Sequence, residues 1–205
     1  MSKKKKIPIA GEIKIILLGE SGVGKTNLIN ILMGLPFNDN EKTSASSSYS
    51  EKKVTINNKL YKLNLWDTIG QETFRQLTKI FYKDSKIVIF VFDITSKPSF
   101  DELQNYWVKD VKDQIGDEGI VKGVIANKID LFLEEKVTTE QGEEYANSIG
   151  AKFLSISAKT DGSKKFENFL MSLIEEYIKI KGDIVDDPSK INLENGGTDK
   201  KKCCS

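Results

Sequence analysis

Residues 19–26, with the sequence Gly-Glu-Ser-Gly-Val-Gly-Lys-Thr, constrain the fold of this chain more than any other stretch. They match the pattern G-x-x-x-x-G-K-[ST] in full, between an apolar run typical of a strand at 13–18 and a helical pattern at 25–33. Glycines let such a loop wrap closely around a phosphate, while the loop amides and the helix N-terminus offer partial positive charge. Lys25 is predicted to reach the β- and γ-phosphates, and the Thr26 hydroxyl to bind Mg²⁺. The alternative, a glycine-rich turn that matches by chance, is disfavoured by the strand and helix around it. The predicted phosphate contacts are Ser21, Gly22, Val23, Gly24, Lys25, Thr26 and Asn27.

The composition excludes several other kinds of chemistry. The chain has 205 residues, 39% of them hydrophobic, which suits a single domain with tails. Its net charge of +1 predicts no long-range attraction to nucleic acid. It contains no histidine, which excludes histidine zinc ligands and histidine general bases. Its two cysteines, Cys203 and Cys204, are adjacent near the end of the sequence, so residues 1–202 can form no disulfide, which agrees with a reducing compartment.

Strand-like and helix-like runs alternate along the chain, which predicts an α/β fold with a mostly parallel sheet covered on both faces. Val54 and Ile56 alternate with polar neighbours before an Asn57-Asn58 turn, so this segment is predicted to form a hairpin and one antiparallel edge strand. The predicted strands are 13–18, 59–66, 87–92, 120–126 and 152–156, and the predicted helices are 25–33, 72–82, 99–114, 139–149 and 164–180.

The chain divides into a folded domain and two polar ends. Residues 1–10 contain the basic run 3–6 and are expected to be a flexible N-terminus. The folded domain is predicted over residues 11–181, because the apolar periodicity of its last helix stops at Gly182. Residues 182–205 are polar and of mixed charge, and we expect them to be a disordered tail.

Two further motifs predict that the nucleotide is a guanine nucleotide. Asn127-Lys128-Ile129-Asp130 follows a predicted strand, where the Asp130 carboxylate can accept hydrogen bonds from N1–H and the exocyclic amine of guanine. Adenine offers no such pair of donors, so the carboxylate selects the base. Ser157-Ala158-Lys159 follows the next strand, where the Ala158 amide is predicted to meet the guanine oxygen. A charged surface turn is the plain alternative, and the phosphate loop disfavours it.

A third motif, Asp67-Thr68-Ile69-Gly70-Gln71, follows the strand predicted at 59–66. Asp67 is predicted to hold Mg²⁺ through a water, and the Gly70 amide to touch the γ-phosphate. Gln71 is predicted to orient the attacking water. The alternative is a polar loop with a solvated carboxylate.

With these motifs the chain resembles the small GTPases of the Ras superfamily, and most closely the Rab branch. The resemblance covers about residues 11–181 and includes the segments 62–66, 73–78, 81–85 and 90–95. It implies a P-loop G domain with a six-stranded sheet, Mg²⁺-dependent binding of GTP and GDP, slow hydrolysis and two switch regions. It also implies that Phe37, twelve residues after Lys25, packs across the guanine; a plain core aromatic is the alternative.

The sequence departs from the Rab pattern in the two switch regions. Residues 43–50 are serine-rich, and their spacing from Phe37 puts Ser44 at the position of a threonine that ligates Mg²⁺ in the GTP state. Thr43 is the second candidate ligand, and a flexible loop without a ligand is the alternative. Ile69 replaces the alanine typical of the family and is predicted to slow hydrolysis or to alter the motion of the switch. Arg75 is the sole arginine and lies after Gln71, so an activating protein is expected to supply a catalytic arginine.

The chain ends in Lys-Lys-Lys-Cys-Cys-Ser, which resembles the double-prenylation signal of Rabs at Cys203 and Cys204. Two lipid chains give stable membrane anchoring, and the lysines strengthen it near anionic lipid. A pair of free thiols is the alternative.

Together these features predict a monomeric, membrane-anchored GTPase switch of vesicle trafficking on the cytoplasmic face of an endomembrane, cycling with the cytosol. The expected partners are an exchange factor, a GTPase-activating protein, effectors and a prenyl-binding chaperone, and no nucleic acid. Two alternatives stay open: a GTP-bound scaffold with little or no hydrolysis, and a P-loop kinase. The kinase would need an arginine-rich lid, which a chain with one arginine does not provide.

Overall fold

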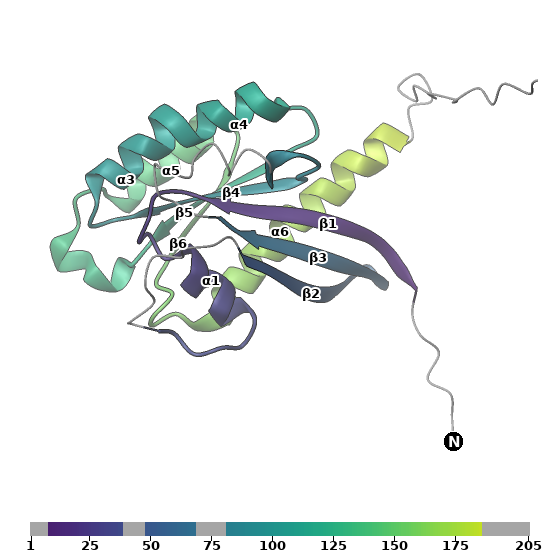
Figure 1. The fold of residues 1–205 in the computed structure, drawn as a ribbon, viewed down its shortest axis with the longest axis horizontal. Coiled ribbons are helices and arrows are strands. Elements are labelled where there is room, and N and C mark those ends of the chain that lie inside the picture. The colour runs from purple at the N-terminus through teal and green to yellow at the C-terminus, as the bar shows by residue number, and fades with distance from the viewer. Residues whose placement is uncertain (1–7, 39–47, 69–80, 186–205) are drawn as a thin grey trace, which may run out of the picture.

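The computed structural model describes residues 8–38, 48–68 and 81–185, which form a three-layer α/β domain (Figure 1). Its six-stranded sheet has the order β2-β3-β1-β4-β5-β6. The pair β2–β3 is antiparallel, and the other four pairs are parallel. These findings confirm the predicted fold class. The strands are β1 Ile9–Leu18, β2 Ser48–Ile56, β3 Lys59–Asp67, β4 Ile87–Asp93, β5 Val121–Asn127 and β6 Lys152–Ile156.

The helices cover both faces of the sheet, with α1 and α6 on one face and α3, α4 and α5 on the other (Figure 1). Their bounds are α1 Lys25–Leu32, α3 Lys97–Glu102, α4 Val108–Ile115, α5 Thr139–Ser148 and α6 Gly162–Val185. A π-helical turn, η2 Leu103–Trp107, joins α3 to α4, and a 3-10 helix, η3 Ile129–Glu134, follows β5.

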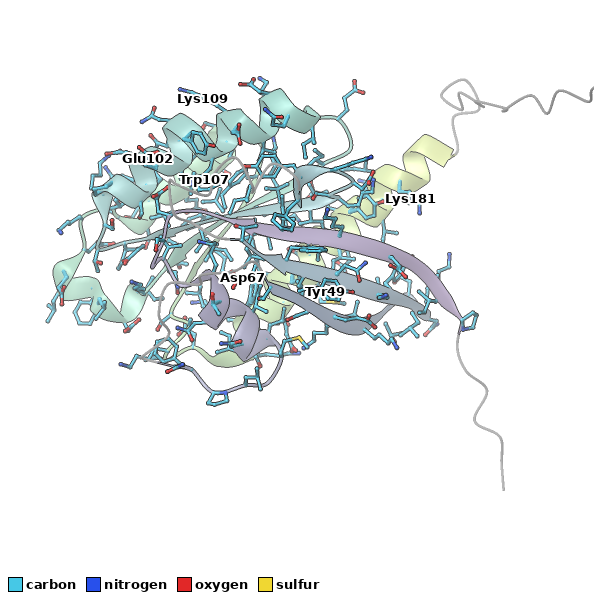
Figure 2. All side chains as sticks on the ribbon, viewed as in Figure 1. Tyr49, Asp67, Glu102, Trp107, Lys109 and Lys181 are labelled. Atoms are coloured by element: carbon cyan, nitrogen blue, oxygen red, sulfur yellow. The ribbon has the colours of Figure 1, made fainter. Side chains whose placement is uncertain are left out.

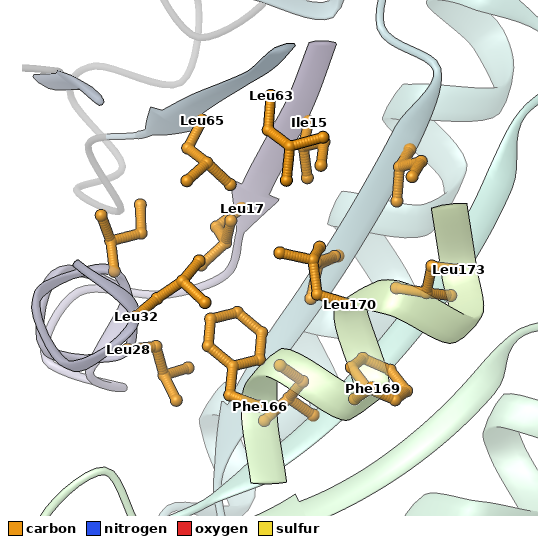
Figure 3. Close-up of a cluster of buried hydrophobic side chains, with 14 of the residues drawn as sticks. Ile15, Leu17, Leu28, Leu32, Leu63, Leu65, Phe166, Phe169, Leu170 and Leu173 are labelled. Carbon is orange, nitrogen blue, oxygen red and sulfur yellow. The ribbon is translucent and has the colours of Figure 1, made fainter. Parts of the chain in front are cut away.

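Two apolar clusters fill the space between these layers. In the first, Phe166 and Leu170 of α6 pack with α1 against Ile15 and Leu17 of β1 (Figure 3). In the second, Phe100 and other residues of the α3–α4 segment pack against the opposite side chains of β1, β4 and β5. Alternate residues of β1 enter the two clusters, and every residue of β4 is buried. Strands buried on both faces are expected to be continuously apolar, as β4 is.

The hairpin forms where the Asn57-Asn58 pair predicts it. Both asparagines have positive φ, 49° and 60°, as a two-residue turn between antiparallel strands requires. Ile56 pairs with Lys59 across this turn, and the ladder continues to Ser48 opposite Asp67.

The main differences from the predicted boundaries are in three elements. β1 begins at Ile9, four residues early, because its exposed first half pairs with β3 without burying an apolar face. The helix predicted at 99–114 is α3, η2 and α4 in succession. α6 continues to Val185, beyond the predicted end at Ile180.

The carboxyl ends of the parallel strands β1, β3, β4, β5 and β6 all lie at one edge of the sheet. In open α/β sheets ligands bind at this edge. None of the helices in the described ranges is long and apolar enough to cross a bilayer.

Candidate nucleotide-binding site

The loop between β1 and α1 packs so closely against neighbouring strands at two positions that only glycine fits there. A Cβ on Gly19 would lie 2.1 Å from the carbonyl oxygen of Val91, and one on Gly24 would lie 2.3 Å from Nδ2 of Asn127. Gly24 also has a φ of 97° at the position that precedes α1. The loop is therefore held tightly against β4 and β5, and any side chain at either position would displace it.

Lys25 begins α1, and its side chain turns back into the loop. Its Nζ donates to the carbonyl oxygens of Gly19 at 2.8 Å and Glu20 at 2.9 Å, and the residue is 6% exposed. Burial lowers the pKa of Lys25 to about 8, against the opposing effect of Asp67 and Glu20. A bound phosphate would favour the charged ammonium, so this lysine fits an anion at the loop.

Thr26 at the start of α1 and Asp67 at the end of β3 bring two oxygen ligands together. The Thr26 hydroxyl donates to Oδ2 of Asp67 at 2.6 Å. The neighbouring Thr68 is buried and donates its hydroxyl to the carbonyl oxygen of Leu17 at 2.6 Å, which anchors the end of β3 to β1. A hydroxyl and a carboxylate beside a phosphate loop are the oxygen donors that Mg²⁺ prefers. These residues therefore fit the predicted metal.

Asn127 connects the phosphate loop to the loop after β6. Its Nδ2 donates to the carbonyl oxygen of Val23 at 2.8 Å, and its Oδ1 accepts from the Ala158 amide at 3.2 Å. The side chain is buried, so both bonds form away from water. Asn127 thus fixes two of the predicted binding loops relative to each other.

The predicted base-reading residues also meet. The hydroxyl of Ser157 donates to Oδ1 of Asp130 at 2.5 Å and accepts from the amides of Lys159 and Thr160, each at 3.1 Å. The Ser157 amide donates to Asp161 at 3.0 Å. The carboxylate predicted to read guanine is therefore oriented by a hydroxyl that the backbone itself holds in place.

Lys159, in the loop after β6, lies over the ring of Phe37. The Lys159 ammonium lies 5.6 Å from the centre of the Phe37 ring, a cation–π distance. Phe37 is half-buried at the edge of the first cluster, so it has both a core contact and a face toward the site.

The other predicted nucleotide-binding residues lie near the phosphate loop and the loop after β5. Lys128 has a φ of 66° and pairs with the Asp93 carboxylate at 2.6 Å, which joins the ends of β4 and β5. Asn27 exchanges two hydrogen bonds with the backbone of Asn38, at 3.2 and 3.1 Å, and so holds the segment that carries Phe37. Ser21, Gly22 and Lys128 border an open cavity of about 480 Å³ beside the phosphate loop.

Several predicted residues lie outside the described residues: Thr43, Ser44, Ile69, Gly70, Gln71, Arg75, Cys203 and Cys204. Sequence reasoning also missed three residues that support the site. Thr68, Asp93 and Asp161 orient the ends of β3, β4 and β6. Thr68 belongs to the motif at 67–71, so its position in that motif could have identified it as a supporting residue.

The fold and these loops define a P-loop nucleotide-binding protein, and comparison with known proteins gives its family. The model of the Ras family matches residues 14–179. The Ras-related protein Rab-21 of Homo sapiens is 36% identical, over 96% of this chain and 92% of its own length. RabC of Dictyostelium discoideum is 37% identical, over 93% and 96%, and Rab-31 of Rattus norvegicus is 38% identical, over 72% and 75%.

This chain therefore belongs to the Ras family, and within it the chain is a Rab-like small GTPase.

Proposed function

We propose that this protein is a guanine-nucleotide switch that binds GTP and GDP with Mg²⁺, hydrolyses GTP slowly and acts in vesicle trafficking. The observation that carries the proposal is the Asp130 carboxylate, held at 2.5 Å by the Ser157 hydroxyl beside a complete phosphate loop. A carboxylate fixed in this way accepts both donors of guanine with little loss of side-chain freedom on binding.

The phosphate end of the proposed ligand is bound by the loop amides and Lys25. Lys25 exchanges its contacts with Gly19 and Glu20 for the β- and γ-phosphates. Thr26 and Asp67 would hold Mg²⁺, with Ser44 or Thr43 as a further ligand in the GTP state. When bound, Mg²⁺ neutralises charge that develops on the phosphate oxygens.

Hydrolysis is assigned to residues around the γ-phosphate. Gln71 orients the attacking water, while Lys25 and the Gly70 amide stabilise the developing charge. Because no arginine precedes Ser44, an activating protein supplies the arginine that accelerates the reaction by about 10³–10⁵.

Membrane attachment is assigned to Cys203 and Cys204. Double prenylation there, with the preceding lysines, anchors the protein to the cytoplasmic face of an endomembrane, and a prenyl-binding chaperone returns it to the cytosol. Membership of the Rab-like GTPases supports regulators and effectors in general as partners of this switch, which we propose is monomeric.

Single-turnover hydrolysis of GTP tests the proposal against a scaffold that keeps GTP bound. We expect the wild type to hydrolyse GTP at a rate on the order of 10⁻⁴ s⁻¹ without an activator, as other unassisted GTPases do. Gln71→Leu is expected to slow this by up to about 10²-fold, because the attacking water loses its orientation. Gln114→Leu, an exposed change on α4, is the matched control and should leave the rate unchanged. GTP binding with equal, negligible turnover in all three proteins would favour the scaffold.

A further inference from the structure

The helix that follows β4 contains a π-helical turn, η2, directly before α4. Such turns are rare within helices and occur frequently at functional sites, because the extra residue redirects the side chains around it. Here the turn ends at Trp107, which is fully buried in the second apolar cluster. Figure 2 shows Trp107 on this helical segment, between the labelled Glu102 and Lys109.

Trp107 contacts the phosphate loop directly. Its indole Nε1 donates to Oε1 of Glu20 at 2.9 Å. Glu20 is the second residue of the loop, and its carbonyl oxygen accepts from Lys25 at 2.9 Å. One residue therefore receives a hydrogen bond from the helix layer on its side chain and one from the phosphate-binding lysine on its backbone.

The negative charge of the Glu20 side chain means that its orientation affects phosphate binding. A carboxylate inside a loop that receives phosphates would repel them if it turned toward the ligand. The contact with Trp107 holds the carboxylate toward η2, whose indole belongs to the second apolar cluster. A hydrogen bond to a charged acceptor is stronger than one between neutral groups, so the indole N–H holds the Glu20 carboxylate strongly.

The residues next to Trp107 on the helix also make fixed contacts. Tyr106 packs edge-on against the indole at 5.1 Å between ring centres. One turn along, the buried Asp110 accepts a hydrogen bond from the hydroxyl of Tyr82 at 2.8 Å. The helix that carries Trp107 is thus fixed to the segment before β4, and the donor is preorganised toward the loop.

We propose that Trp107 is a positioning residue for nucleotide binding: its hydrogen bond to Glu20 fixes the phosphate loop and keeps the Glu20 carboxylate away from the phosphates. This inference rests on the proposed binding of guanine nucleotide. Trp107 takes no part in the chemistry and acts only through Glu20.

A double-mutant cycle on release of fluorescently labelled GDP tests this role. Trp107→Phe keeps an aromatic ring but removes the donor, and is expected to accelerate GDP release about tenfold, the usual size of a hydrogen bond to a charged group. In a Glu20→Leu background the indole has no acceptor, so the same change should accelerate release by less than about twofold. Val111→Ala, a buried change in the same cluster, is the control for packing and should leave release unchanged.

The indole N–H resonance of Trp107, recorded by ¹H–¹⁵N NMR, provides a readout that loss of packing does not imitate. The two tryptophans are assigned with Trp66→Phe, and the Trp107 resonance should move upfield in Glu20→Leu but stay near its wild-type position in Glu20→Gln, which keeps an oxygen acceptor. Equal acceleration by Trp107→Phe in both backgrounds, or an unmoved resonance in Glu20→Leu, would overturn the inference. A wild type that binds no GDP would instead refute the proposed function, and the resonance would still report on the contact.

Discussion

The substitution Asp130→Asn examines the base-reading site with little change in shape. In the wild type, Oδ1 of Asp130 accepts the Ser157 hydroxyl at 2.5 Å, and two backbone amides fix that hydroxyl. The amide oxygen of an asparagine can accept the same hydroxyl. The loop should therefore keep its conformation, while the group turned toward the base changes from a charged acceptor to an N–H₂ donor.

The expected loss follows from the two hydrogen bonds that guanine makes to the carboxylate. A hydrogen bond to a charged group contributes about 1.5–3 kcal/mol, so losing two weakens GDP binding by about 3–6 kcal/mol, or roughly 10²–10⁴-fold. Xanthine carries an oxygen where guanine carries its amine, and that oxygen accepts from the new N–H₂ group. The variant should therefore prefer xanthosine diphosphate to GDP.

Competition against labelled nucleotide measures this reversal, with GDP, xanthosine diphosphate and ADP as competitors. Ser157→Ala is the matched control: it removes the orienting hydroxyl but keeps the carboxylate, so it should weaken GDP about tenfold without changing the order of bases. Thermal unfolding of each variant separates loss of folding from loss of recognition. If Asp130→Asn prefers guanine over xanthine as strongly as the wild type, the assignment of Asp130 is wrong.

Three other changes test separate parts of the account. Gly19→Ala puts a Cβ 2.1 Å from the Val91 carbonyl oxygen. Calorimetry should find that the variant loses about 1–3 kcal/mol of stability and no longer binds nucleotide. A variant with wild-type stability and nucleotide binding would contradict the loop geometry. Thr138→Ala removes the capping box of α5 and should cost about 1 kcal/mol in urea unfolding while GDP affinity stays constant, and an affinity change would show unforeseen coupling. The pKa of Lys25 is lowered from 10.5 to about 8 by burial, so GDP binding between those pH values should take up a proton and weaken as the pH rises. Titration calorimetry in buffers of different ionisation enthalpy measures that uptake, and its absence would refute the environment assigned to Lys25.

Described residues of several motifs meet at one edge of the sheet because each motif lies at the end of a strand. Asn127, Asp130 and Ser157 were predicted as separate contacts in two loops, and the structure brings these loops together. Spacing along the chain predicts which residues reach one edge of the sheet. It does not predict that the Ser157 hydroxyl orients the Asp130 carboxylate, because that contact depends on side-chain rotamers.

Three features were not predicted from the sequence, each for its own physical reason. The π-helical turn at 103–107 adds a residue without interrupting the apolar face, so the periodicity of 99–114 reads as one helix. The bond from Trp107 to Glu20 joins residues 87 positions apart and leaves no local pattern. The first half of β1 is largely exposed and pairs with β3 without an apolar alternation, so it could be mistaken for part of a polar terminus.

The most direct test of a guanine-nucleotide switch is to identify the nucleotide that the purified protein carries. Mass spectrometry of the native protein, followed by chromatography of the released ligand, should find GDP or GTP in a ratio near one per chain. Adenine nucleotides at comparable occupancy, or GDP retained equally by wild type and Asp130→Asn, would contradict the central claim.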